Sequence, residues 1–170
     1  MNTVIKTTGW KAELKALKYE HIKSTSPGFF EMSGGYQMKL MPYRDDTANG
    51  LTKCIIDYIN FKGGYANRIN TMGVARKERI NLAFGNYRDN ITYTPSTTNK
   101  GTADIKATIR GQSLDIEVKI GRDKLSDHQI KEKERVTRAG GLYFVARDMQ
   151  SFVDWYKESF TIKTLSFAKV

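Results

Sequence analysis

Strict alternation of apolar and charged residues marks one stretch of the chain, Leu114 to Ile120. Its apolar positions are separated by Asp115, Glu117 and Lys119. Alternation with a period of two predicts a β-strand with one buried face, because successive side chains point to opposite sides. The three charged side chains are therefore expected together on one face of a sheet, opposite the core.

The segment before this strand, Ala103 to Arg110, is rich in β-forming residues and leads into Gly111, which predicts a tight hairpin. A two-residue loop that contains Gly111 allows two registers. Asp104 lies opposite Glu117 in one register and opposite Lys119 in the other. Both registers place Asp104 on the charged face, provided that the strands carry no bulge.

Helical periodicity is clearest where apolar residues recur at the spacing of one helix face, at Leu51, Cys54, Ile55, Tyr58 and Ile59. Further helices are expected over Trp10–Ile22, Asp127–Ala139 and Met149–Phe160. Strands are expected over Tyr36–Tyr43, Tyr65–Asn70 and Leu142–Val145, with a hairpin over Arg79–Tyr93 that turns near Gly85-Asn86. Helices and strands follow one another along a single chain, which indicates an α/β fold with an N-terminal helical extension.

Net charge adds information about partners. The chain of 170 residues suits one domain and carries 28 Lys and Arg against 18 Asp and Glu, a formal charge of +10. Such a balance favours a polyanionic partner, most often a nucleic acid. A basic protein that is merely soluble has the same composition, so charge alone does not decide.

Basic and aromatic residues are interleaved between Val74 and Tyr93. The basic residues are Arg76, Lys77, Arg79 and Arg88, and the rings are Phe84, Tyr87 and Tyr93. Cations bind phosphates and rings stack on unpaired bases, so this segment suits a nucleic-acid surface. The alternative is that the rings fill a small core.

Several function classes lack their sequence signatures. There is no GxxxxGK phosphate loop, no Cys/His zinc spacing and no GxSxG nucleophile elbow. Cys54, the single cysteine, lies on the apolar helix stripe and is expected to be a core thiol rather than a nucleophile. No apolar run of 18 residues and no signal-peptide pattern occurs, so we expect an intracellular, cytoplasmic protein without membrane contact.

Two carboxylates and a lysine on one sheet face form a recognisable chemical group. Asp and Glu oxygens suit Mg²⁺ or Mn²⁺, and such an ion polarises a phosphodiester oxygen and lowers the pKa of a bound water. A lysine can hold that water or neutralise the charge that develops on phosphorus. The alternative is an ordinary strand whose charged face lies in solvent.

The wider spacing resembles a known nuclease family, the VRR-NUC branch of the PD-(D/E)xK nucleases. Four motifs carry the resemblance: Gly101-x-x-Asp104, Ile116-Glu117-Val118-Lys119, Leu125-Ser126-x-x-Gln129, and Ala139-Gly140-Gly141 before an apolar strand. The likeness spans about Leu51 to Tyr156 and is closest to small stand-alone members found in bacteriophages. It implies a metal-dependent DNA nuclease on a restriction endonuclease-like αβββαβ core, with a mixed central sheet flanked by helices.

The resemblance also implies roles for individual residues. Asp104 and Glu117 hold Mg²⁺ or Mn²⁺, aided by the Val118 carbonyl. Lys119 is then the catalytic lysine. Gln129 matches a glutamine that family members place beside the site, although its position also makes it a capping-box residue of its own helix.

Basic residues near this site are candidates for DNA contacts. Arg68 matches a first-strand residue that faces the substrate in family members, and a solvated edge residue is the alternative. Arg122 and Lys124 follow the strand of Glu117 directly and could bind a phosphate near the site. Many nucleases of this superfamily also carry a glutamate on the first helix, but Thr47 to Thr52 holds none, and Asn49 is the nearest substitute.

These expectations divide the chain into an N-terminal extension packed on or beside the core (1–45), a nuclease domain (46–160) and a C-terminal edge segment (161–170). The predicted function is metal-dependent endonucleolytic cleavage of DNA. Selectivity for branched or junction DNA and a homodimer are expected by analogy with resolvase relatives. One alternative is a DNA-binding accessory protein of the same fold without useful catalysis, for phage recombination, replication or packaging. Another is an interaction module whose N-terminal helix recruits a partner.

Overall fold

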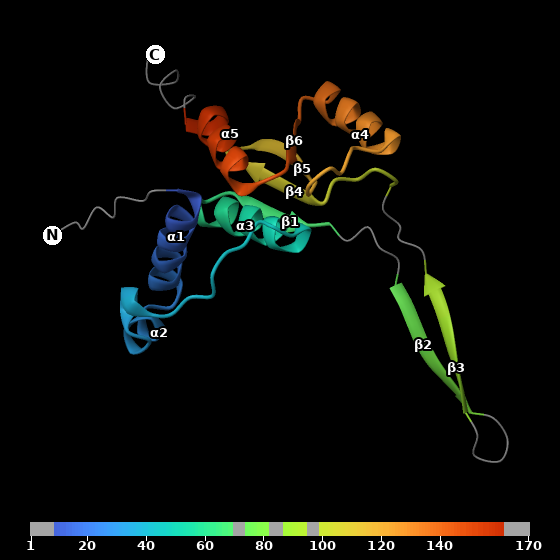
Figure 1. The fold of residues 1–170 in the computed structure, drawn as a ribbon, viewed down its shortest axis with the longest axis horizontal. Helices are drawn as coiled ribbons and strands as arrows, with labels where there is room; N and C mark the ends of the chain where they lie inside the picture. Colours follow the sequence, from blue (N-terminus) through green and yellow to red (C-terminus); the bar gives the residue numbers. More distant parts are fainter. Residues whose placement is uncertain (1–8, 70–73, 82–86, 95–98, 162–170) are drawn as a thin grey trace.

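The computed structural model describes residues 9–69, 74–81, 87–94 and 99–161 (Figure 1). The helices are α1 (Trp10–Thr25), α2 (Pro27–Met32), the short 3-10 helix η1 (Gly35–Gln37), α3 (Ala48–Phe61), α4 (Asp127–Arg138) and α5 (Met149–Thr161). The strands are β1 (Tyr65–Arg68), β2 (Val74–Asn81), β3 (Tyr87–Thr94), β4 (Ile105–Ile109), β5 (Gln112–Val118) and β6 (Leu142–Ala146).

Four strands form the central sheet in the order β1-β4-β5-β6. The pairs β1–β4 and β4–β5 are antiparallel, whereas β5 and β6 are parallel. A parallel pair needs a crossover connection, and α4 provides it between β5 and β6. The predicted α/β fold, with a mixed sheet flanked by helices, is therefore confirmed.

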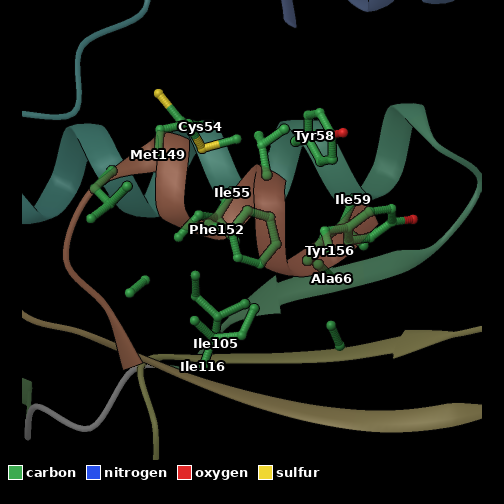
Figure 2. Close-up of a cluster of buried hydrophobic side chains, with 14 of the residues drawn as sticks. Cys54, Ile55, Tyr58, Ile59, Ala66, Ile105, Ile116, Met149, Phe152 and Tyr156 are labelled. Atoms are coloured by element: carbon green, nitrogen blue, oxygen red, sulfur yellow. The ribbon is translucent and has the colours of Figure 1, made fainter. Parts of the chain in front are cut away.

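The core lies between this sheet and the pair α3 and α5. All five residues of the predicted α3 stripe are at most 1% exposed. Figure 2 shows Cys54, Ile55, Tyr58 and Ile59 of this stripe in one cluster with Ile105 and Ile116 of the sheet and Phe152 of α5. Burial of each large apolar side chain contributes roughly 1.5–3 kcal/mol. Cys54 belongs to this core as predicted, and burial raises the pKa of its thiol to about 11.

The N-terminal helix α1 packs on α3 and α5 through a polar contact at its first turn. Glu13 accepts a hydrogen bond from the Tyr58 hydroxyl at 3.0 Å. The same carboxylate lies 2.6 Å from Lys157 Nζ and 3.3 Å from Lys62 Nζ. Leu14, the next residue, is fully buried in the common core. Thus α1 joins the two core helices.

The predicted strand over Tyr36–Tyr43 is wrong. The structure has η1 at the start of this segment and irregular backbone after it. The segment contacts α1 and not a neighbouring strand: the Tyr19 hydroxyl donates to the Met38 carbonyl at 2.6 Å. The Tyr36 hydroxyl likewise donates to the Glu20 carboxylate at 2.6 Å.

Strands β2 and β3 form a separate hairpin that extends away from the rest of the molecule (Figure 1). They pair over their full length, from Val74 opposite Thr94 to Asn81 opposite Tyr87, which confirms the predicted hairpin. The predicted turn near Gly85-Asn86 lies outside the described residues. So do positions 95–98, after β3, and positions 162–170 of the predicted C-terminal edge segment.

The rings of this hairpin do not fill a core. Tyr87 and Tyr93 are 58% and 63% exposed, so the small-core interpretation is wrong for both. Phe84, the third ring, lies outside the described residues.

Among the helices that the structure describes, none has the length and apolar character needed to cross a membrane.

Candidate functional site

The hairpin β4–β5 fixes the relation between the two candidate metal-binding carboxylates. Its loop is Arg110-Gly111, and both residues have positive φ, 51° and 81°, as a type I′ turn requires. The paired positions run from Ile109 opposite Gln112 to Ile105 opposite Ile116. Continuing this register by one residue sets Asp104 opposite Glu117. The structure thus selects one of the two registers that the sequence allowed.

The charged face of β5 is buried, not solvated. Asp115 and Glu117 are each only 2% exposed, and the Lys119 side chain is 14% exposed. The interpretation of β5 as an ordinary strand with its charges in solvent is therefore wrong. Helix α4 covers this face, opposite the side on which α3 and α5 pack, and its Gln129 contacts Glu117.

Glu117 is the centre of the polar cluster on this face. Its Oε1 lies 3.1 Å from Lys119 Nζ and accepts a hydrogen bond from Gln129 Nε2. Its Oε2 is buried without a hydrogen-bond partner among the described residues. Burial, and secondarily the charge of Asp104, raises the pKa of the Glu117 carboxyl, although Lys119 acts in the opposite direction. One oxygen of the Glu117 carboxylate therefore contacts Lys119 and Gln129, whereas the other has no hydrogen bond within the described structure.

Asp104 is fixed at the junction of three strands. Its Oδ2 accepts a hydrogen bond from the Val118 amide at 2.9 Å. Its backbone carbonyl accepts one from Ile69 N at 2.8 Å, just past the end of β1. The contact from Val118 uses the amide; the predicted role of the Val118 carbonyl stays a prediction.

Gln129 unites two roles that sequence reasoning treated as alternatives. Its Oε1 accepts a hydrogen bond from Ser126 N at 2.9 Å, and the Ser126 hydroxyl accepts one from Gln129 N at 3.4 Å. This is the predicted capping box of α4. The other end of the same amide donates to Glu117. Capping therefore fixes the orientation in which the amide meets the carboxylate.

Gly101 holds the loop before Asp104 against the first turn of α4. Its φ is +88°, a conformation that favours glycine. A Cβ atom at this position would overlap the His128 carbonyl and lie 3.0 Å from Gln129 N. Only glycine allows this approach, so Gly101 sets the spacing between the segment of Asp104 and the helix of Gln129.

Sequence reasoning missed a further polar group on this face, the hydroxyl of Tyr143. Tyr143 pairs with Asp115 across β5 and β6 and therefore shares the face of Glu117. The hydroxyl is buried without a hydrogen-bond partner in the described part of the chain. Burial, followed by the charges of Glu117 and Asp115, raises the pKa of Tyr143. Tyr143 lies within the apolar run Leu142–Val145, and this pattern does not indicate that its hydroxyl lies beside the carboxylates.

Asp115 lies next to this group and is held by a surface lysine. Its Oδ2 lies 3.3 Å from Lys106 Nζ, within ion-pair distance but without hydrogen-bond geometry. The Lys106 side chain is half exposed, whereas Asp115 is buried. The buried face therefore carries two lysine–carboxylate pairs, one at Glu117 and one at Asp115.

The donor set suits a hard divalent cation but is small. Asp104 and Glu117 offer carboxylate oxygens, the ligands that Mg²⁺ and Mn²⁺ prefer, and no described residue forms a hydrogen bond with Glu117 Oε2. The first turn of α3 holds no acid, and Asn49 accepts a hydrogen bond from Arg68 Nη1 at 3.0 Å. Within the described ranges, no group of three or more acidic, His or Cys side chains is arranged to hold a metal ion. The residues thus fit a cation for which water molecules or substrate atoms supply most of the ligands.

The candidate DNA-contacting residues occupy three separate places. Arg68 pairs with Ile105 and therefore belongs by register to the α3 side of the sheet, opposite the face of Glu117. Arg122 and Lys124 are exposed in the loop after β5. Arg147, which sequence reasoning missed, donates to two carbonyls of that loop, at 3.3 Å and 3.0 Å.

The remaining candidates, Arg76, Lys77 and Arg79, lie on the projecting hairpin (Figure 1). The structure does not bring them together with the carboxylates. Any ligand that contacts both places must therefore be extended.

No family model matches the chain, and no curated protein is significantly similar to it in sequence.

Proposed function

We propose that this chain is a divalent-metal-dependent DNA endonuclease of the VRR-NUC type, with branched DNA as its preferred substrate. The observation that carries the proposal is the position of Asp104, which continues the β4–β5 register opposite Glu117 and accepts from Val118 N, on a face where Lys119 contacts Glu117. A pure DNA-binding surface has no use for two carboxylates, because they repel phosphate.

The order of elements supports a restriction endonuclease-like core. Helix α3, strands β1, β4 and β5, helix α4 and strand β6 follow one another as the expected αβββαβ arrangement. The hairpin β2–β3 is an insertion between the first two strands of this core. The proposed family assignment rests on this order together with the four sequence motifs.

Asp104 and Glu117 are the residues that would hold Mg²⁺ or Mn²⁺. When bound, such an ion supplies charge that polarises a phosphodiester oxygen and lowers the pKa of a bound water. Burial raises the pKa of Glu117 although Lys119 lies beside it, and Glu117 Oε2 has no hydrogen-bond partner among the described residues. A divalent cation would favour the ionised carboxylate and would take this oxygen as a ligand.

The neighbouring side chains have distinct tasks in the proposed hydrolysis. Gln129 fixes one oxygen of Glu117, because its own amide is already anchored at the start of α4. Lys119 is largely shielded from solvent and carries its charge beside the carboxylates, where it can orient the attacking water or neutralise charge on phosphorus. The attacking water forms a bond to phosphorus and gives up a proton to solvent, while the bond from phosphorus to the leaving oxygen breaks and that oxygen takes up a proton from solvent.

The test is cleavage of labelled single-stranded, duplex, flap and four-way-junction DNA by the full chain with Mg²⁺, Mn²⁺ or EDTA. We expect cleavage that requires metal and is lost in Glu117→Ala and Lys119→Ala. Lys106→Ala is the matched control, because Lys106 also pairs with a buried carboxylate on this face but lies at Asp115. Full activity of Glu117→Ala would overturn the proposal.

A second measurement tests metal binding without activity. A ligand that binds only the folded state raises the melting temperature. Mg²⁺ or Mn²⁺ should therefore stabilise the wild type against heat and should have little effect on Asp104→Asn or Glu117→Gln. An equal metal-induced shift in all three proteins would show that the ion binds elsewhere.

A DNA-binding accessory protein of the same fold is the second candidate function. The absence of an acid in the first turn of α3 favours it, because the site then offers only two carboxylates. Tight binding of DNA without cleavage in either metal would establish this alternative.

A further inference from the structure

The hairpin β2–β3 has two chemically different faces. Side chains alternate along each strand, and paired residues share a face. Lys77 and Arg79 of β2 therefore lie on the same face as Tyr87, Ile91 and Tyr93 of β3, and we call this set the tyrosine face. The opposite face carries Arg76, Glu78, Ile80, Arg88, Asn90 and Thr92.

The tyrosine face exposes unusual apolar area. Tyr87, Ile91 and Tyr93 are 58%, 68% and 63% exposed. A two-stranded hairpin is marginally stable by itself, and contiguous exposed apolar side chains usually mark a binding surface. The length of the hairpin and the position of these side chains are therefore better explained by a ligand than by folding.

Cations on this face are already ordered among the rings. The Arg79 guanidinium lies 4.1 Å from the centre of the Tyr87 ring. Asp89 of β3 lies on the same face and forms ion pairs with both cations, at 2.7 Å from Lys77 Nζ and 3.9 Å from Arg79 Nε. All of these charged side chains remain in contact with solvent. A ligand would thus meet rings and cations side by side.

The charges discriminate between two classes of ligand. A second copy of the chain, joined through a two-fold axis at this face, would bring the Lys77 and Arg79 cations of both copies into one interface. Asp89 is already shared by two cations, so it does not neutralise that repulsion. A nucleic-acid strand offers phosphates to the cations and bases to the rings, and it meets no such penalty.

We propose that the tyrosine face binds an unpaired stretch of DNA strand, with Tyr87 and Tyr93 stacking on bases while Lys77 and Arg79 contact phosphates. The two rings are six residues apart on β3, or about 20 Å, so they contact bases several nucleotides apart. This inference rests on the proposed function, since it names the feature that distinguishes a flap from duplex DNA, its unpaired bases, as the one that this chain selects.

The test measures affinity, not cleavage. Fluorescence anisotropy of the full chain in EDTA compares a labelled single-stranded oligonucleotide with a duplex of the same sequence. Tyr87→Ala and Tyr93→Ala should each weaken single-strand binding by about tenfold. Duplex binding should change less than twofold, because paired bases offer no free face. Ile80→Ala is the control, since Ile80 is an exposed apolar residue of the opposite face.

Two charge variants sharpen the test. Asp89→Asn should tighten binding severalfold, because it removes the carboxylate that competes with phosphate for both cations. The double variant Lys77→Ala/Arg79→Ala should weaken binding more than Arg76→Ala/Arg88→Ala, although both remove two positive charges. Equal losses would show that net charge, and not the tyrosine face, governs affinity, and would overturn the proposal.

The remaining outcomes are equally decisive. Unchanged single-strand affinity in both tyrosine variants would overturn the proposal. So would a change from dimer to monomer without loss of DNA affinity, since the face would then be a contact between copies. Because the assay contains no metal, failure of the proposed nuclease activity leaves its result unaffected. Circular dichroism of each variant confirms that the fold is retained.

Discussion

Gln129 and Glu117 are linked by a hydrogen bond in which one side-chain amide meets a buried carboxylate while its other end caps a helix. The link crosses from α4 to β5, so the start of the helix and the centre of the polar cluster are one unit. A residue that stabilises a helix terminus thereby also orients a candidate metal ligand. This coupling predicts that the two roles can be separated by substitution.

Gln129→Glu is expected to keep the capping box, because a glutamate at this position also accepts from the Ser126 amide. It should nevertheless abolish DNA cleavage, since a second carboxylate then lies against Glu117. Gln129→Ala should lose both roles and cost about 1 kcal/mol of unfolding free energy. Urea unfolding and a cleavage assay on both variants provide the measurement. Equal stability and equal activity in the two variants would contradict a dual role.

Glu117 is expected to make the metal-free protein less stable as pH rises. Its pKa in the folded state is raised by burial, so the folded state binds more protons than the unfolded state between the two pKa values. Stability is then greatest below the unfolded pKa and falls as pH rises through the folded pKa. Glu117→Gln should remove this loss and be more stable at neutral pH by roughly 1 kcal/mol.

Urea unfolding of wild type and Glu117→Gln in EDTA, at several pH values between about 4 and 8, checks this expectation. The range begins near the reference pKa of glutamate and extends above it. The advantage of the variant should shrink as pH falls. An advantage that is constant across the pH range would mean that the charge of Glu117 is not its cause.

Gly101→Ala is expected to displace the start of α4. The added methyl group would overlap the His128 carbonyl, in addition to the cost of positive φ. Gly140→Ala is the matched control, because Gly140 has nearly the same φ, +86°, with nothing near its Cβ position. Gly101→Ala should cost about 1–3 kcal/mol more than the control, as overpacking does, and should also reduce cleavage. Equal destabilisation in thermal unfolding would show that the loop and helix separate easily.

Tyr143→Phe is expected to leave stability unchanged or to raise it by up to about 1 kcal/mol, because it removes a buried hydroxyl without a partner in the described structure. Tyr58→Phe provides the contrast. The Tyr58 hydroxyl is bonded to Glu13 at 3.0 Å, so its removal should cost about 1 kcal/mol. Chemical unfolding of both variants tests the difference, and a larger loss for Tyr143→Phe would reveal an essential contact of its hydroxyl.

The periodicity of β5 was enough to predict its strand, its hairpin and the shared face of Asp104, Glu117 and Lys119. It could not choose the register, because that depends on whether Arg110 accepts positive φ. Nor could it predict burial of the charged face. Helix α4 is highly charged, and nothing in its composition signals that it covers carboxylates.

The failed strand over Tyr36–Tyr43 has a different origin. Strand formation needs a partner strand, and the β propensity of an aromatic segment does not show whether one exists. The rings of Tyr36, Tyr19 and Phe30 pack edge to face, with centroids 5.1–6.5 Å apart. Tertiary packing of rings thus replaced the ladder that local sequence favoured.

The insertion between β1 and β4 begins and ends at one point of the sheet. Arg68 pairs with Ile105, and Ile69 N donates to the Asp104 carbonyl at 2.8 Å, so the two ends of the insertion are tied together independently of what lies between them. The hairpin β2–β3 can therefore be replaced by a longer, shorter or differently charged segment that starts and ends at the same residues, without moving Asp104. A hairpin that changes in length or charge thus leaves the position of the carboxylate cluster unchanged.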